Sequence, residues 1–396
     1  MTALERRASL SLAAIYGLRM LGLFLVLPVF ALEAAHYPGG DDPARVGLAM
    51  GLYGLSQGLL QIPFGLASDR WGRKRVIVAG LLVMALGSLV AALASTLDGL
   101  MVGRALQGAG AVSAAASALL ADQTRDEVRT KALALVGGSI ALTFALSLVL
   151  GPALAALIGL SGLFDLTGLL ALAGAAAVVW LVPAEPPRAQ ALRPAAAARV
   201  LLSAAMLRLD FGVFVLYAAQ IAMWVAVPAL LVQAGLDKQH HWQVYLPTVL
   251  ASFGVMGATL FPMERRGRLR AVFLVAIAVL VLVQAGFVAA AAHPAVPLLS
   301  LLIFAYFSGF NILEAAQPSL ASRLAPAQAR GAALGVYNTL QSLGMFAGGW
   351  AGGLLMRSHG AAGLFLACGV ATLAWLLVAW PMSTPPPGAA AGAKAG

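Results

Sequence analysis

Long apolar stretches alternate along the chain with short segments rich in charge, glycine or proline. Stretches such as 76–93 and 271–292 have the length of about 20 residues that a helix needs to cross the hydrocarbon core of a membrane. They lack the alternation of apolar and polar positions that strands of a membrane barrel show. Because every backbone N–H and C=O group in hydrocarbon needs an internal partner, these stretches predict transmembrane helices.

Charge clusters, glycines and prolines divide the chain into twelve predicted spans. They lie near 10–32, 46–67, 76–95, 99–121, 132–157, 162–182, 209–232, 243–262, 271–292, 295–318, 330–356 and 361–381. The sequence therefore predicts an all-α integral membrane protein with two six-helix halves, 1–182 and 209–382. The Pro- and Ala-rich connection 183–208 is expected to be a cytoplasmic linker, and the Ala- and Gly-rich tail 383–396 to be disordered.

Composition and charge agree with this arrangement. Hydrophobic residues make up 61% of the chain and charged residues 10%, and the mean hydropathy is +0.91. With the amino terminus inside, twenty of the 25 Lys and Arg residues fall on the inner side. Arg45, Lys238 and Arg357 fall outside, and Arg19 and Arg104 fall within spans. The excess predicts a multi-pass bacterial inner-membrane protein with both termini in the cytoplasm, so the net charge of +10 requires no nucleic-acid partner.

The first apolar run, 10–32, has a second interpretation. Glu5-Arg6-Arg7 before it and Ala31-Leu32-Glu33-Ala34 after it resemble the flanks of a cleavable signal peptide. The run is long enough to span a membrane, so we expect it to be retained as the first helix.

The loop between the second and third spans carries the most distinctive motif, Gly65-Leu-Ala-Ser68-Asp69-Arg70-Trp71-Gly72-Arg73-Lys74-Arg75. Glycines permit a tight turn, and Asp69 can sit against the positive end of a neighbouring helix dipole. The loop therefore predicts a breakable conformational latch, and a basic loop that only fixes orientation is the alternative. The predicted latch residues are Gly65, Asp69, Arg70, Gly72, Arg73, Lys74 and Asp122.

A shorter form of this motif recurs in the second half. Asp69-x-x-Gly72-Arg73 follows the second span, and Glu264-x-x-Gly267-Arg268 follows the eighth. The equivalent positions indicate duplication of a six-helix block in parallel orientation.

These motifs resemble those of the major facilitator superfamily. Its G-x-L-A-D-R-x-G-R-[KR]-x hallmark is matched except that Ser68 replaces the usual Ala, and Arg104 to Ala111 resembles its R-x-x-Q-G-x-G-A pattern. Gly151-Pro152 resembles the core of the antiporter motif on the fifth helix, although Ala and Leu replace further glycines there. The runs Leu18 to Gly22, Tyr53 to Gln57 and Phe310 to Glu314 look like YajR-type members of the drug:proton antiporter branch.

The resemblance implies a central cavity lined by the first, fourth, seventh and tenth helices, with Arg104 linked to proton coupling. Ionisable residues inside a span are functional candidates by default, which favours Arg104 and Glu314, and Glu33 is a second candidate carboxylate. Glu314 is the only carboxylate predicted deep in a helix, and burial would favour its neutral form. Hydrogen bonding between helices is the alternative for each of the other predicted cavity residues. These are Arg19, Tyr53, Gln57, Gln61, Gln107, Tyr217, Gln220, Trp224, Asn311, Tyr337 and Gln341.

The leading functional prediction is export of a small amphipathic or drug-like compound in exchange for protons, by alternating access. Proton symport or uniport of a metabolite such as a sugar or amino acid stays open, as does a membrane sensor. An enzyme is not expected, because the sequence has no H-E-x-x-H, G-x-S-x-G or Walker motif. We expect no cofactor and no metal, since the single Cys368 excludes a thiolate cluster, and the resemblance implies a monomer.

Overall fold

The computed structural model describes residues 1–110, 112–185, 203–324 and 330–382. This part of the chain forms α-helices, one short 3₁₀ helix and no strand, which confirms the predicted all-α class. The helices are α1 (Ala3–Ala34), α2 (Pro43–Trp71), α3 (Arg73–Ala92), α4 (Leu97–Ala109), α5 (Ser113–Asp122), α6 (Asp126–Trp180), α8 (Ala204–Gln233), η1 (Lys238–His240), α9 (Trp242–Arg265), α10 (Leu269–Ala290), α11 (Val296–Leu324) and α12 (Arg330–Ala379).

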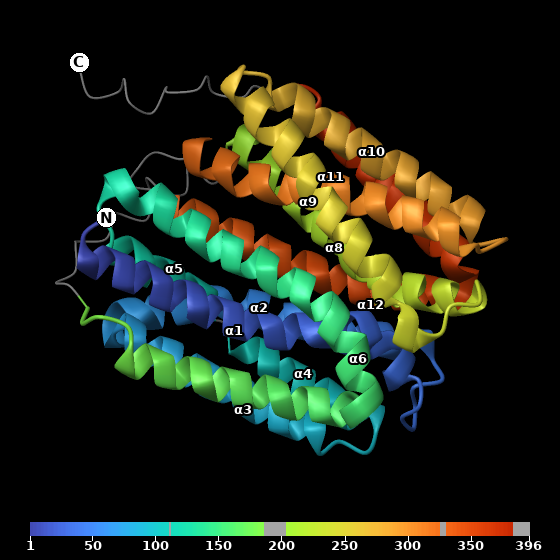
Figure 1. Ribbon diagram of the computed structural model, residues 1–396, viewed down its shortest axis with the longest axis horizontal. Coiled ribbons are helices and arrows are strands. Elements are labelled where there is room, and N and C mark those ends of the chain that lie inside the picture. Colours follow the sequence, from blue (N-terminus) through green and yellow to red (C-terminus); the bar gives the residue numbers. More distant parts are fainter. Residues whose placement is uncertain (111, 186–202, 325–329, 383–396) are drawn as a thin grey trace.

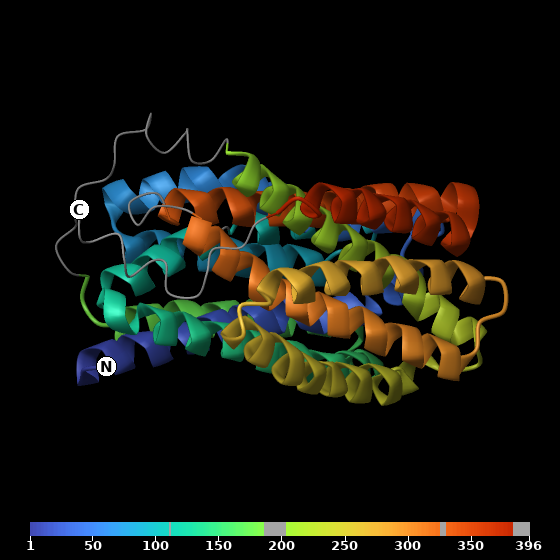
Figure 2. The ribbon, with the colours of Figure 1, turned by 90° about the horizontal axis from the view of Figure 1, so that it is seen from above.

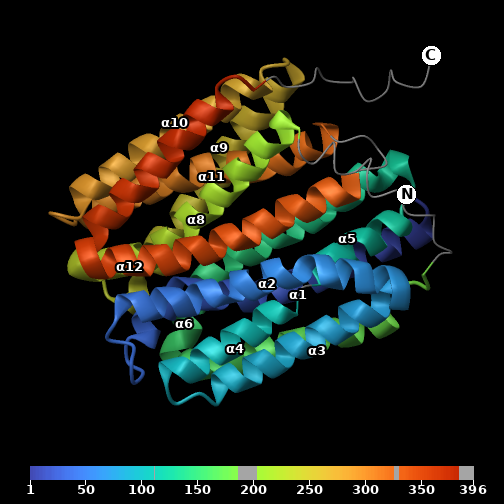
Figure 3. The same cartoon turned by 180° about the vertical axis from the view of Figure 1, so that it is seen from behind.

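The helices run along one long axis and form two sets (Figure 1). Helices α1 to α6 pack mainly on one another and form the amino-terminal set, and α8 to α12 form the carboxy-terminal set. Figure 2 shows the same bundle from above, and Figure 3 shows α2 and α12 side by side where the sets meet. We call the end of the bundle at which α2 passes into α3, with Arg70, Arg73 and Lys74, the basic end.

The surface of the bundle is suited to lipid. By length and composition, eight helices of the described chain can cross a membrane. Large apolar side chains cover their outer faces, among them Leu157 at 81% exposure and Leu282 at 71%. Such exposure is favourable only where hydrocarbon replaces water as the solvent.

Helices α6 and α12 each fold back on themselves at one glycine (Figures 1 and 3). Gly159 has φ 68° and ψ −177°, and Gly360 has φ 65° and ψ −168°, values that other residues rarely adopt. The first arm of α6 approaches α1 at Gly17 and Leu25, and its second arm returns past Gly22. The predicted pairs 132–157 with 162–182 and 330–356 with 361–381 are therefore antiparallel arms joined by single-residue turns.

One predicted span is wrong as a single helix. The stretch 99–121 is divided into α4, which ends at Ala109, and α5, which begins at Ser113. Gly110 leaves helical geometry with ψ 49° and lies so close to the Gly80 carbonyl of α3 that a β-carbon would overlap it. Glycine therefore allows α4 to end in close contact with α3.

Glycines of α12 pack closely against helices of both sets, and we call the contact of α12 with α2 the seam between the sets. On one side of α12, Gly349 and Gly353 lie against the backbone of α2 at Gly47 and Pro43. On its other side, Gly344, Gly348 and Gly352 lie against the backbone of α8. The Gly-x-x-x-Gly repeats at 344–348 and 349–353 thus permit close helix approach on two sides of α12.

The close packing of α12 on α8 predicts that one added methyl group destabilises the protein at Gly348 but not at Gly335. Gly348→Ala would push a β-carbon into the Ala218 carbonyl, and such overpacking costs about 1–3 kcal/mol of unfolding free energy. Gly335→Ala on the same helix meets no described atom within 4 Å and should leave stability unchanged or slightly raised. Thermal unfolding in one detergent checks both variants, and equal midpoints would contradict the close packing of α12 on α8.

Candidate functional site

Arg19 of α1 is buried among polar side chains of the amino-terminal set. Its Nη1 donates to Ser113 Oγ at 2.7 Å, and its Nη2 donates to Tyr53 Oη at 3.0 Å and Gln57 Oε1 at 3.3 Å. These bonds replace the water that a buried guanidinium lacks. The structure thus joins three predicted cavity residues, and it adds Ser113, which has no distinguishing pattern in the sequence.

Arg104 of α4 lies next to this group. Its guanidinium sits over the ring of Tyr53, 4.9 Å from the centroid, and over the ring of Phe30 at 5.9 Å. Its Nη1 donates to Gln107 Oε1 at 2.9 Å, and Gln107 Nε2 donates to Ser88 Oγ on α3 at 2.8 Å. Aromatic faces stabilise a cation that has little water, so Tyr53 serves both buried arginines.

The buried carboxylate of Glu314 lies in the carboxy-terminal set. Tyr217 of α8 donates its hydroxyl to Glu314 Oε1 at 2.7 Å, while Oε2 has no described hydrogen-bond partner. Tyr337 of α12 interacts electrostatically with Glu314 and donates to Gln317 Oε1 at 3.5 Å. Gln341 is also a partner of Tyr217. We call these five residues, Tyr217, Glu314, Gln317, Tyr337 and Gln341, the Glu314 cluster.

Other predicted cavity residues lie elsewhere. Asn311 donates its Nδ2 to Ser252 Oγ on α9 at 2.8 Å, which is a bond between helices. Gln61 is 1% exposed, and neither of its amide atoms has a described partner. Gln220 is buried in α8, and the buried Trp224 packs against Tyr245 with ring centroids 5.3 Å apart.

Aromatic side chains connect the two sets in the interior. The rings of Phe24 and Phe144 lie 5.0 Å apart in the amino-terminal set, and Phe144 lies 5.6 Å from Phe307 of α11. Phe307 in turn contacts Trp224 at 6.2 Å. The contact between Phe144 and Phe307 therefore brings α6 and α11 together without a polar group.

The residues predicted as a latch meet at the basic end, around the single residue Gly72 between α2 and α3. Arg73 Nη1 pairs with Asp69 Oδ1 at 2.5 Å, and Arg73 Nε pairs with Asp122 Oδ2 at 3.2 Å. The other predicted members lie at the end of α2 or the start of α3: Gly65, Arg70 and Lys74. The structure thus assembles Asp69, Arg73 and Asp122 from three helices.

Sequence analysis missed a further member of this assembly. Glu185, just after α6, accepts hydrogen bonds from the backbone N–H groups of Arg73 at 3.1 Å and Lys74 at 2.7 Å. A carboxylate at a helix start is favourable because it satisfies free N–H groups and matches the helix dipole. This contact could not be predicted from the sequence, because Arg73 and Glu185 lie more than 100 residues apart along the chain.

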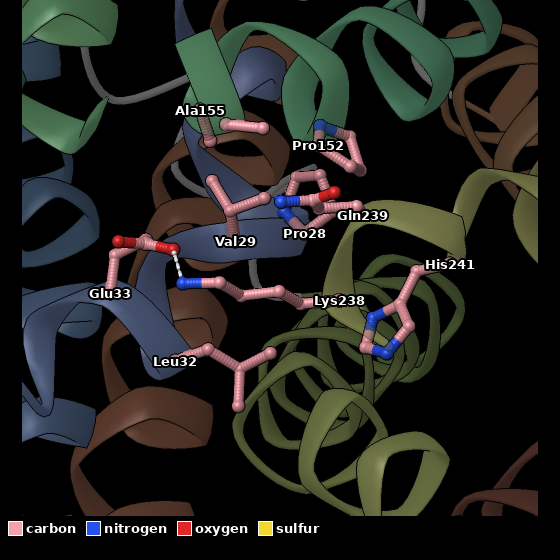
Figure 4. A pocket seen from close by; sticks show the side chains of 10 residues that line it. Pro28, Val29, Leu32, Glu33, Pro152, Ala155, Lys238, Gln239 and His241 are labelled. Atoms are coloured by element: carbon pink, nitrogen blue, oxygen red, sulfur yellow. Dashed lines mark hydrogen bonds and ion pairs between the residues drawn. The ribbon is translucent and has the colours of Figure 1, made fainter. Parts of the chain in front are cut away.

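At the end opposite the basic end, ion pairs join the two sets. Glu33 of α1 pairs with Lys238 of η1, Oε1 to Nζ, at 2.7 Å (Figure 4). Asp42, before α2, pairs with Arg357 of α12, Oδ2 to Nη1, at 3.0 Å. Lys238 and Arg357 are two of the three basic residues predicted outside, which was the available signal for these contacts.

A small pocket lies beside the Glu33–Lys238 pair, between α1, α6 and η1 (Figure 4). Its lining includes Pro28 of α1 and Pro152 of α6. The preceding residue, Gly151, approaches the Leu25 carbonyl so closely that a β-carbon would lie 2.7 Å from the oxygen. The motif on the fifth predicted helix thus fits α6 against α1. The pocket belongs to this junction and does not include the buried polar clusters.

Comparison with known proteins finds matches over nearly the whole chain. The model of the Major Facilitator Superfamily matches residues 12–349 and also residues 263–396. The chain is 40% identical over 390 residues to the inner membrane transport protein YajR of Escherichia coli (strain K12), which covers 98% of this chain and 85% of that protein. Over 141 residues it is 33% identical to the class B tetracycline resistance protein of Escherichia coli, covering 35% of this chain and 34% of that protein.

Solved transporter structures have the same fold. The human organic anion transporter MFSD10 has a TM-score of 0.71 at 18% identity, covering 95% of this chain and 99% of that chain. The nucleoside transporter NupG has a TM-score of 0.74 at 14% identity, covering 94% and 99%. At such identities the likeness concerns the fold alone.

The contact at the start of α3 predicts graded effects. Glu185→Gln keeps one acceptor but removes the charge, and should lower stability by about 0.3–1 kcal/mol. Glu185→Ala removes both acceptors and should cost about 1–2 kcal/mol. Thermal unfolding in detergent measures both, with Asp165→Asn as the matched control at an exposed carboxylate. Wild-type midpoints for both Glu185 variants would show that this carboxylate does not stabilise α3.

Proposed function

Because the chain belongs to the Major Facilitator Superfamily, a family of membrane transporters and not of enzymes, we propose that it exports a small amphipathic compound in exchange for protons. The observation that carries this proposal is Glu314, a carboxylate in a membrane helix with one hydrogen bond and no described basic partner. Ionisable groups at such depth are retained for a function, because they are costly to bury.

Proton exchange suits the surroundings of Glu314. A carboxyl group without a basic partner is stable in a dry site when it carries a proton, and it can release that proton when water enters. Tyr217 can donate to either form of the group. Arg104 and Arg19 lie in the amino-terminal set, so a compound between the sets would contact cationic groups on one side and a carboxyl group on the other.

We propose that the chain crosses the membrane twelve times, with the basic end in the cytoplasm. Helices α6 and α12 contribute two crossings each, and α4 with α5 contributes one interrupted crossing. Helix α2 is long enough for another. The halves 1–182 and 209–382 then correspond to the two sets, while most of the linker 183–208 and the tail 383–396 lie outside the described residues.

The two ion pairs at the opposite end support alternating access. Glu33–Lys238 and Asp42–Arg357 each join one set to the other, as does the glycine seam between α2 and α12. We infer that the structure is the state closed toward the outside, and that these pairs open when the sets rock apart. The Asp69–Arg73–Asp122 assembly is the proposed latch at the cytoplasmic end.

Export is favoured over uptake by the relatives. The class B tetracycline resistance protein, similar over about a third of this chain, is named for resistance to a drug. The Ala and Leu residues around Gly151-Pro152 keep symport and uniport as the second candidates, because antiporters usually carry further glycines there.

Proton coupling can be measured in everted vesicles with an acid interior. Adding compounds from a panel should trigger proton efflux with the wild-type protein. Glu314→Gln should abolish it, because an amide cannot carry the proton, and Arg104→Ala should reduce it at least about tenfold. The exposed-site variant Asp165→Asn is the control and should behave as wild type.

Either of two results would count against this proposal. Normal efflux in Glu314→Gln, at matched expression, would remove Glu314 from the coupling role. Compound movement without proton movement would favour uniport, and movement of both in the same direction would favour symport.

The ion pairs at the outer end predict a charge-reversal effect. Lys238→Glu should shift the equilibrium constant between the closed and the open state about two- to fivefold toward the open state. The reason is that an exposed ion pair contributes up to about 1 kcal/mol. The double variant Glu33→Lys with Lys238→Glu should restore it. The measurement is the labelling rate of a cysteine introduced at Gln57, with Cys368 replaced by Ala, using an impermeant maleimide on intact cells. Labelling of the double variant as fast as the single variant would contradict the role of this pair.

A further inference from the structure

Two carboxylates differ from all others whose side chains the structure describes. Most of the others pair with Arg or Lys, and Glu185 binds backbone N–H groups. The exposed ones are Asp41, Asp165 and Asp237. Among the described residues, Glu314 and Asp210 alone lie within membrane helices with buried carboxylate oxygens and no basic partner. Sequence reasoning named Glu314 as the only carboxylate deep in a helix and did not single out Asp210, which lies near the start of α8.

Asp210 is the more isolated of the two. Its side chain is 2% exposed, and neither Oδ1 nor Oδ2 has a hydrogen-bond partner in the described chain. It lies six residues after Ala204, the first residue of α8, which corresponds to a rise of about 9 Å from the basic end. The sequence contained this signal, because the predicted span 209–232 includes Asp210.

The register of α12 on α8 brings Tyr337 close to Asp210. Gly344 lies against Phe214, Gly348 against Ala218 and Gly352 against Ala222, with the same offset at each contact. Continued toward the basic end, this register sets Asp210 beside position 340, one turn from Tyr337. Tyr337 also interacts electrostatically with both Asp210 and Glu314. Tyr337 is thus an electrostatic neighbour of both carboxyl groups.

No cation balances Asp210 in the described part of the chain. The titratable group that interacts with it is Tyr337 from α12, which itself interacts with Glu314 of α11. A neutral phenol cannot balance a negative charge as water or a cation would. Arg208, two residues earlier on α8, forms no ion pair with it. The indole of Trp375 packs against α8 at Gly212, and its Nε1 has no hydrogen-bond partner among the described residues.

We propose that Asp210 is a second proton-binding site, which together with Glu314 gives the carboxy-terminal set two carboxyl groups that load and release protons. An ionised carboxylate buried without a donor is strongly unfavourable, so in this closed state Asp210 carries a proton. Water that enters from the basic end reaches Asp210 before Glu314, because Asp210 lies nearer that end. The role of this proton in transport rests on the proposed proton-coupled export.

Infrared spectroscopy of the purified full-length protein tests proton binding without any transported compound. A protonated carboxyl group gives a C=O stretch that is separate from the carboxylate bands and shifts in D₂O. At neutral pH this band should fall by about half in Asp210→Asn, since two buried carboxyl groups contribute to it. Asp210→Glu should keep the intensity of the band but shift its frequency, and the exposed-site control Asp165→Asn should leave both unchanged.

The opposite result would overturn the inference. If Asp210→Asn and Asp165→Asn both leave the band at wild-type intensity in folded protein, Asp210 is ionised and holds no proton. If Asp210→Asn does not fold, Asp210→Glu still tests the inference. Its carboxyl group should carry a proton in a changed position, so part of the C=O band should shift in frequency. An unshifted band in Asp210→Glu would also overturn it.

The same variants in everted vesicles separate this inference from the proposed function. A band that depends on Asp210, in a protein whose transport moves no protons, would support the site and refute proton-coupled export. Proton-coupled export with a band independent of Asp210 would refute the site alone. If both hold, Asp210→Asn should move about half as many protons per transported compound as the wild type.

Discussion

The backbone contact of α12 with both α2 and α8 is the constraint on which the rest of the arrangement depends. Lipid gives no hydrophobic drive for helices to associate, so close packing of backbones must hold the sets together. Glycines on two sides of α12 make that packing possible. The same contact aligns Tyr337 and Gln341 with Tyr217 on α8, and it brings Arg357 to Asp42 at the end opposite the basic end.

Buried charged groups that form no described ion pair are divided between the sets by sign. Arg19 and Arg104 lie in the amino-terminal set, where hydroxyl, amide and aromatic groups stabilise the guanidinium groups. Asp210 and Glu314 lie in the carboxy-terminal set, where one tyrosine hydroxyl is the described donor to them. Arginine keeps its charge at any ordinary pH, while a carboxyl group can lose its charge by binding a proton. One set therefore carries a fixed charge and the other an adjustable one.

Much of the fold could be predicted because lipid imposes simple rules on sequence. Apolar length indicated the positions of most helices, and the motif around Asp69 and Arg73 marked residues that lie together at the basic end. The division at Gly110 could not be predicted, because it depends on how closely α4 meets α3. Partners such as Glu185 and the pair of Glu33 with Lys238 could not be assigned either, because helix packing brings them together from distant parts of the chain.

The single-residue turns at Gly159 and Gly360 have a consequence for how the protein is made. Each turn joins two membrane-length arms with no hydrated loop between them. The second arm begins within a residue of the end of the first, so the emerging chain has no slack with which to insert the arms one at a time. If each arm crosses the membrane, as proposed, each pair must enter the bilayer as one helical hairpin. The four arms of α6 and α12 would then be inserted as two helical hairpins.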